Sequence, residues 1–151
     1  MNIRGRQRWS QAGLLAGLVL ASCGMPCLAC SVSATPLAFG TINPLDGVQT
    51  TSVATVVVSC PSDAAYAIAL SAGNGSYDLR RMSDGIDSLD YQVFADSSHS
   101  LVAGDGTAGT TTLSGSAGPS GTSHYLYGVV PAQRQAVPAA YSDTLIVTVS
   151  Y

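Results

Sequence analysis

The stretch that decides the fold is residues 50–60, TTSVATVVVSC. Valine and threonine fill it, and their β-branched side chains favour strands over helices. Side chains of a strand point alternately to its two faces, so Val56, Val57 and Val58 place apolar groups on both faces. We therefore expect a buried strand in the middle of a sheet at residues 50–60.

Seven further segments resemble this one in composition, and Gly, Pro, Asn or Asp residues separate them. These candidate strands are residues 31–39, 66–71, 79–82, 89–95, 110–114, 124–130 and 144–151. No segment has the apolar period of a helix. The sequence therefore predicts an all-β protein, an immunoglobulin-like β-sandwich of about six to seven strands.

Two of these segments alternate cleanly between apolar and other side chains. The apolar sets are Leu89, Tyr91 and Val93 in residues 89–95, and Tyr125, Tyr127 and Val129 in residues 124–130. Each pattern predicts a strand with one buried face. Between residues 66–71 and 79–82, the dipeptide of Asn74 and Gly75 is typical of a tight hairpin turn.

Charged residues make up only 10% of the chain, and each sign of charge is represented by one residue type. All six basic residues are Arg and all nine acidic residues are Asp. Lys and Glu, which populate exposed helix faces, are absent. Arg4, Arg6 and Arg8 lie at the N-terminus, so the rest of the chain is acidic. A nucleic-acid binder needs a basic face, and the composition therefore excludes that class.

The N-terminus has the features of a secretory signal peptide. Its arginines precede an apolar core at residues 12–21, which is too short to span a bilayer. Cleavage after Ala29 would make residues 1–29 the signal and leave residues 30–151 as one domain. Alternatively, LASC at residues 20–23 fits a lipoprotein box, with a lipid on Cys23. No later segment predicts an integral membrane span.

The cysteine count favours the first cut. Cleavage after Ala29 leaves Cys30 and Cys60, which can pair in an oxidising compartment. Lipidation at Cys23 leaves Cys27 as an odd thiol. Because Cys30 and Cys60 flank the first two expected strands, we expect a structural disulfide between them. A metal site or catalytic thiol pair would need His or Asp partners at ligand spacing, which the sequence lacks.

No catalytic, metal or cofactor motif stands in a supporting context. The sequence beginning at Gly104 spells G-x-G-x-x-G, but no predicted helix follows it, as a dinucleotide site requires. Asp84, Asp87 and Asp90 do not have the spacing of a calcium-binding loop. We therefore expect a protein that is not an enzyme and that uses no metal or cofactor.

The remaining polar candidates are predicted to be structural. The two histidines, His99 and His124, belong to no nucleophile motif. The charged residues near position 80 are expected to form a surface group and a candidate interface: Asp78, Arg80, Arg81 and Asp84.

Several short motifs occur in a characteristic order between residues 30 and 151. They are CSVSATPLAFG at 30–40, Cys60, RM at 81–82, LDYQVF at 89–94, GDG at 104–106, YGVVP at 127–131 and PAAYSDT at 138–144. In order and spacing the chain resembles the spore coat protein U family, whose members include subunits of archaic chaperone–usher pili. It departs from that pattern in two ways. Ala103 stands where many relatives have Trp, and Cys30 directly follows the expected cut, which leaves little or no N-terminal extension.

The resemblance bears most on the last strand. In pilins that the chain resembles, the sandwich lacks its final strand, and the C-terminal strand borders the resulting groove. A periplasmic chaperone fills this groove, and a strand of a neighbouring subunit later replaces it by β-strand addition. Here the partner-strand interface would be Leu145, Val147, Val149 and Tyr151, which share one face of residues 144–151. Periodicity alone favours a complete sandwich, whereas the resemblance favours the incomplete one.

The resemblance implies a structural subunit of a surface fibre, or pilus, that serves attachment or biofilm formation. Its partners would be a periplasmic chaperone, an outer-membrane usher and neighbouring pilus subunits, and it would pass through the periplasm to the cell surface. Two alternatives stay open. A self-contained secreted or surface coat protein would fold without a chaperone. A carbohydrate-binding module would need a concave site with converging polar and aromatic groups.

Overall fold

The computed structural model describes residues 29–151, which contain eight β-strands and one short 3-10 helix. Residues 1–28, with the arginines and apolar core of the expected signal and with Cys23 and Cys27, lie outside the described residues. No α-helix occurs in residues 29–151, as the composition predicted. Accordingly, no helix in that range is suited to crossing a membrane.

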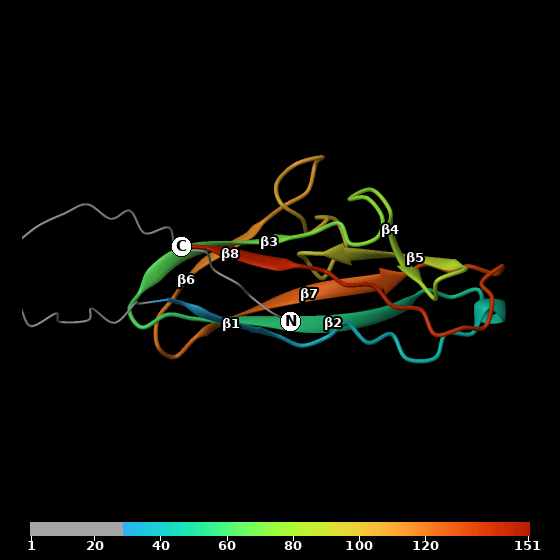
Figure 1. The fold of residues 1–151 in the computed structure, drawn as a ribbon, viewed down its shortest axis with the longest axis horizontal. Helices are drawn as coiled ribbons and strands as arrows, with labels where there is room; N and C mark the ends of the chain where they lie inside the picture. Colours follow the sequence, from blue (N-terminus) through green and yellow to red (C-terminus); the bar gives the residue numbers. More distant parts are fainter. Residues whose placement is uncertain (1–28) are drawn as a thin grey trace, which may run out of the picture.

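The strands form two antiparallel sheets. The elements in chain order are β1 (Ser31–Ala34), η1 (Pro44–Asp46), β2 (Thr50–Ser59), β3 (Ala64–Leu70), β4 (Arg80–Ser83), β5 (Ser88–Phe94), β6 (Leu113–Ala117), β7 (Thr122–Val130) and β8 (Val147–Ser150). One sheet has the order β1-β2-β7-β5-β4, and the other has the order β6-β3-β8. In Figure 1, β1 and β2 lie along one long side of the molecule, β3 and β8 lie toward the other, and η1 lies at one end.

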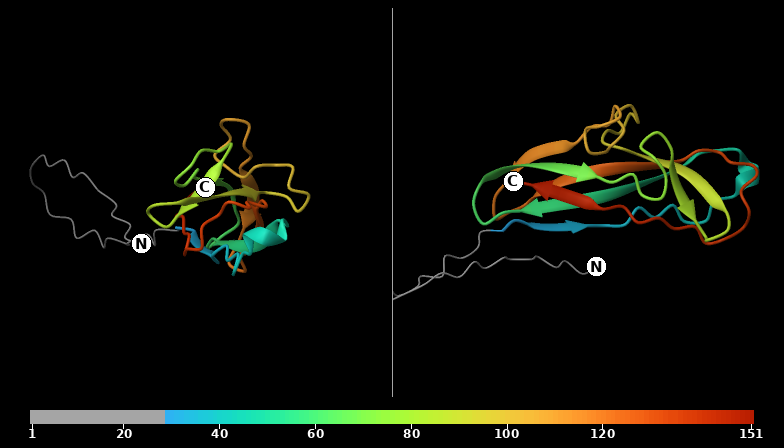
Figure 2. Two further views of the ribbon diagram at one scale, coloured as in Figure 1. Left: turned by 90° about the vertical axis from the view of Figure 1, so that its right-hand side faces the viewer. Right: turned by 45° about the horizontal axis from the view of Figure 1, so that its top comes forward.

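One apolar core lies between the two sheets. The side chains facing it alternate along the long strands and are each at most 5% exposed: Ala54, Val56, Val58, Tyr66, Ile68, Leu70, Leu89, Tyr91, Val93, Leu126 and Val130. Each large apolar side chain buried in this way stabilises the fold by roughly 1.5–3 kcal/mol. Figure 2 (right) shows β8, in red, between β3 and the pair of β1 and β2, so the last strand covers one side of this core.

Each of the eight candidate segments contains or overlaps a strand, so the expected total of about six to seven strands was too low. The weakest candidates, residues 79–82 and 110–114, correspond to β4 and β6, shifted by one and three residues at their starts. Both lie at a sheet edge, where pairing with one longer neighbour is enough to hold a short strand.

The first candidate strand is shorter than expected. The β1 ladder ends at Ala34, because Pro36 has no N–H to donate. Residues 35–38 nevertheless continue beside β2, since the Thr35 amide donates to the Thr55 carbonyl at 2.9 Å. This extended segment after β1 forms one wall of the site described below.

Two other expectations for the local structure were wrong. Asn74 and Gly75 do not make a hairpin, because the strands on either side, β3 and β4, belong to different sheets. The last ladder begins at Val147 and not at Thr144, although the carbonyl of Ile146 still accepts a hydrogen bond of 3.0 Å from the Ser71 amide.

Candidate functional site: a groove between the first and last strands

The first and last strands each leave an open edge. β1 pairs only with β2, β8 pairs only with β3, and the two lie in different sheets. No backbone pairing joins β1 to β8 in residues 29–151. At β4, by contrast, Ser83 and Ser142 exchange backbone hydrogen bonds of 2.9 and 3.1 Å, which connect the five-stranded sheet to the segment before β8. An unpaired strand edge is a template for another strand.

A cavity of about 310 Å³ lies between residues 34–39 and residues 141–147. Its lining is mostly apolar: Ala34, Pro36, Leu37, Phe39, Ala54, Val56, Leu70, Met82, Leu126, Leu145 and Val147. A second cavity, of about 490 Å³, continues toward Pro44 of η1 and shares Leu37, Phe39, Met82 and Tyr141 with the first. We call the two cavities together the groove. Its floor is the hydrophobic core.

The segment that ends in β8 forms one wall of the groove. Leu145, Val147 and Val149 are half-buried and pack against the core, whereas Ile146 between them is 63% exposed. This is the two-residue period of a strand with one face inward. The local sequence therefore turns Leu145, Val147 and Val149 inward and leaves Ile146 and Thr148 outside.

The segment after β1 forms the opposite wall, and a glycine of β7 makes room for it. Phe39 and Leu37 pack against Gly128. A Cβ atom at residue 128 would lie 2.7 Å from the Phe39 Cζ and 3.0 Å from the Leu37 Cδ2. Only glycine allows the backbone of β7 to approach both side chains so closely.

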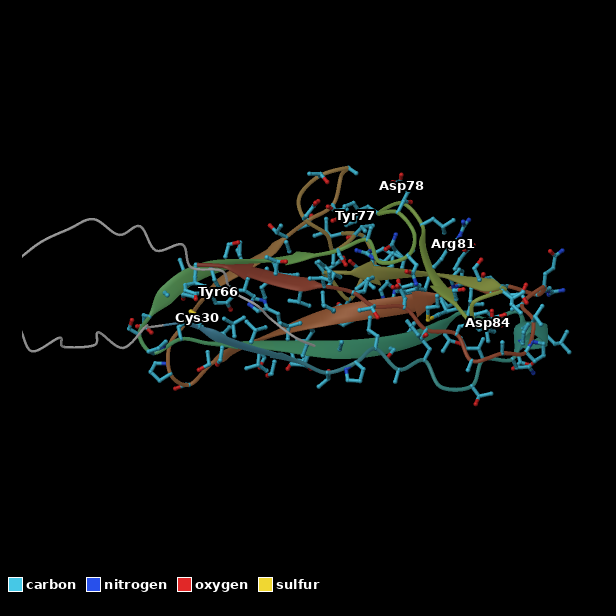
Figure 3. All side chains as sticks on the ribbon, in the orientation of Figure 1. Cys30, Tyr66, Tyr77, Asp78, Arg81 and Asp84 are labelled. Carbon is cyan, nitrogen blue, oxygen red and sulfur yellow. A yellow bond between two sulfur atoms is a disulfide. The ribbon has the colours of Figure 1, made fainter. Side chains whose placement is uncertain are left out.

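A disulfide fixes the end of this wall. It joins Cys30 to Cys60, with the two Cα atoms 4.2 Å apart, as the cysteine count predicted. Cys60 is 2% exposed, whereas all four residues of β1 are exposed. Figure 3 shows Cys30 at the opposite end of the molecule from η1. The bond therefore ties an exposed edge strand to the core.

A polar contact interrupts the apolar lining. The hydroxyl of Tyr91 donates to Oδ2 of Asp143 at 2.5 Å. Oδ1 of Asp143 accepts from the backbone amides of Asn74 at 3.1 Å and Thr144 at 2.7 Å. Burial, reinforced by the Asp143 carboxylate, raises the pKa of Tyr91, so its hydroxyl remains a donor at every physiological pH.

Behind this contact lies a fully buried arginine. The guanidinium of Arg80 donates to Gln92 Oε1 at 2.5 Å and to the carbonyls of Ser71 and Ala103 at 3.0 and 2.7 Å, and its Nε has no partner. Its Cζ atom lies 5.5 Å from the centre of the Tyr77 ring. Burial lowers the pKa of Arg80, while the fields of Tyr91, Tyr77 and Asp143 oppose that shift. The arginine ties the end of β3 to β5 beside the groove.

The family model for the spore coat protein U domain matches residues 20–148. The chain belongs to the spore coat protein U domain family. This confirms the resemblance inferred from the motifs, and the match covers both walls and the floor of the groove.

A solved structure shares the fold of this spore coat protein U domain. It is a chain in the crystal structure of the CsuC–CsuE chaperone–tip adhesion subunit pre-assembly complex, from the archaic chaperone–usher Csu pili of Acinetobacter baumannii. The TM-score is 0.55 at 20% sequence identity, over 82% of this chain and 39% of that chain. The domain therefore spans well under half the length of the chain it matches, and it has a pilin-like fold. No curated protein matches it significantly.

The predicted partner-contact residues of this spore coat protein U domain do not all lie together. Leu145 and Val147 line the groove, and Val149 packs on the core beyond it. Tyr151 follows β8 and is 63% exposed. Whether these residues contact a partner strand stays a prediction.

The charged group near position 80 was only partly assigned correctly. Arg81 forms a surface ion pair with Asp90 at 3.1 Å, and Figure 3 shows Asp78 and Arg81 at the periphery of the domain. Arg80 was expected at the surface and is instead 0% exposed. The signal was available, because Arg80 lies two residues from Met82, whose apolar side chain must face inward.

The other polar candidates have structural contacts. The Asp84 carboxylate accepts hydrogen bonds from the amides of Ile86 and Asp87 and so caps a turn. His124 lies 2.6 Å from the Tyr66 hydroxyl, and burial lowers its pKa. No group of three metal-ligating side chains occurs among the residues that the structure describes.

Proposed function

We propose that this domain is a non-enzymatic structural subunit of an archaic chaperone–usher surface fibre. Its immunoglobulin-like sandwich lacks one strand, and the groove is the vacant position. A periplasmic chaperone first inserts a strand there, and a neighbouring subunit's strand then replaces it during assembly at an outer-membrane usher. Export by a signal peptide cleaved after Ala29, and a role in surface attachment or biofilm formation, belong to the same proposal.

The observation that carries the proposal is the pair of open strand edges that flank an apolar cavity above the core. A strand laid between residues 34–39 and β8 gains backbone hydrogen bonds at the open edge of β8. Its inward side chains enter the apolar lining. Three such side chains contribute roughly 5–9 kcal/mol of hydrophobic free energy before the cost of ordering the strand. A complementary strand therefore stabilises the domain substantially.

Co-expression with its periplasmic chaperone tests this function. We expect the exported wild-type domain to be aggregation-prone alone and to be recovered with the chaperone as a soluble complex with one copy of each chain. Val147→Asp places a carboxylate in the groove and should abolish the complex. Thr148→Asp is the matched control, because its side chain is exposed on the other face of β8, and it should leave the complex intact.

Two results would contradict the proposal. One is a soluble, stable wild-type monomer that ignores the chaperone, which would support a self-contained coat protein. The other is an equally strong complex with Val147→Asp and with Thr148→Asp, which would mean that the chaperone binds elsewhere.

A further inference from the structure

Among the residues that line the groove, Asp143 is the one with a charged side chain. It lies on the inward face of its segment, in step with Leu145 and Val147. Its three hydrogen-bond donors are the Tyr91 hydroxyl and the backbone amides of Asn74 and Thr144. All three donors are neutral, so the carboxylate is hydrogen-bonded but no cation pairs with it directly.

No arginine in residues 30–151 forms an ion pair with this carboxylate. The domain's three arginines are Arg80, Arg81 and Arg134, and nine aspartates accompany them in residues 30–151. Arg80 acts on Asp143 only through its field, because its bonded donors are committed to Gln92 and two backbone carbonyls. Arg81 pairs with Asp90, and the guanidinium of Arg134 lies beside Gly47. A cation that bonds Asp143 directly must therefore come from outside the domain.

Filling the groove changes the surroundings of Asp143. An inserted strand excludes water, which now solvates the half-buried carboxylate, and charge interactions strengthen as the local dielectric falls. If the inserted strand places an apolar side chain opposite Asp143, the desolvated carboxylate keeps acceptor positions without a donor. This lowers the free energy gained on binding. A basic side chain at the same register supplies both donors and charge.

We propose that Asp143, held by Tyr91, is a specificity-determining subsite that selects a partner strand carrying a Lys or Arg side chain opposite it. This inference rests on the proposed function, because it assumes that the groove takes a strand. The other inward side chains of that strand are apolar, to match the lining. The single basic residue fixes the register, since a two-residue slip would bury it among apolar side chains and leave Asp143 without its partner.

Designed peptides test the register. The probes are strands of about ten residues with alternating Val and Thr, in which one inward Val at a time is replaced by Lys or by Met. The full chain is exported, purified and refolded with each peptide, and binding is measured by fluorescence anisotropy. At one register the Lys peptide should bind about tenfold more tightly than the Met peptide, and at the other registers more weakly.

Variants locate the effect. Asp143→Asn should reduce the preference for Lys at that register to within about twofold, a loss expected for removal of a charge-assisted bond. Asp78→Asn is the matched control, because it removes the same charge from an exposed site outside the groove, and it should keep the preference. If Asp143→Asn fails to fold, the salt dependence of peptide binding to the wild-type protein tests the same proposal. Raising the salt concentration from about 0.1 M to about 1 M should weaken binding of the Lys peptide and leave binding of the Met peptide unchanged.

The outcomes separate the two proposals. If peptides bind in the groove but Lys and Met are equivalent at every register, the basic-residue subsite is wrong and the proposed function stands. The same holds if Asp78→Asn removes the preference as fully as Asp143→Asn. If no alternating peptide binds, the groove takes no strand, and the proposed function fails together with this inference.

Discussion

Loss of the Cys30–Cys60 disulfide should destabilise this domain more than any single change on its surface. The bond closes a loop with a sequence separation of 30 residues. The chain-entropy relation gives about 3.6 kcal/mol at 25 °C for a loop of this size. For a domain of this length that corresponds to a fall in Tm of roughly 14 °C. The exposed β1 strand should loosen first, because only its ladder with β2 then holds it.

Urea unfolding followed by circular dichroism measures the effect on dilute, exported protein. Comparison of the oxidised with the reduced wild-type domain isolates the cross-link, since no atoms are lost from the core. The double variant Cys30→Ala with Cys60→Ala should lose about 1 kcal/mol more, because Cys60 is buried. A loss below about 1 kcal/mol on reduction would refute the reasoning, since it would mean that the rest of the fold already holds the ends of the loop together.

Three further changes have defined expected results. Arg80→Lys should cost about 2–3 kcal/mol of unfolding free energy, because an ammonium group cannot reach all the acceptors that the buried guanidinium serves; an unchanged urea midpoint would contradict this. Gly128→Val should cost about 1–3 kcal/mol by displacing Phe39, and should weaken strand binding more than an equally destabilising substitution outside the groove. Because folding lowers the pKa of His124, the unfolded chain takes up the proton first. Stability should be full above the ordinary pKa of 6.5 and fall as the pH drops below it, and His124→Gln should flatten this dependence in urea titrations at several pH values.

The positions of the strands could be predicted because they depend on local composition. Residues 50–60 are dense in β-branched side chains and became β2, and residues 89–95 alternate cleanly and became β5. The direction in which a strand faces was harder to predict. Tyr125 and its neighbours of the same parity share the outer face of β7, and Tyr125 is 53% exposed. Alternation defines two faces without saying which one is buried.

The buried face of β7 was hidden by a glycine. Gly128 occupies an inward position and reserves space for Phe39, which comes from a distant part of the sequence. Its role depends on a tertiary contact, so no local pattern around residue 128 could reveal it. The disulfide, by contrast, could be predicted without any tertiary contact, since the expected cleavage leaves only two cysteines in the exported chain.

The polar part of the groove depends on long-range contacts in the same way. Asp143 meets Tyr91 across 52 residues of sequence and Asn74 across 69. Neither separation follows a helical or strand period, so no local pattern indicated these contacts, although Asp143 lies in the PAAYSDT motif and Tyr91 in the LDYQVF motif. The open groove itself required knowing that β1 and β8 lie at the edges of different sheets, which is a property of topology and not of any one segment.

Amide hydrogen exchange, read out by mass spectrometry, tests the central claim most directly. The exported domain is compared alone and in complex with its periplasmic chaperone. We expect the amides of residues 34–39 and of β8 that are not bonded to β2 or β3 to exchange quickly in the free domain and to become strongly protected in the complex, while those of the inner strand β7 change little. Protection of both edges in the free domain, or protection in the complex confined to another surface, would contradict the account.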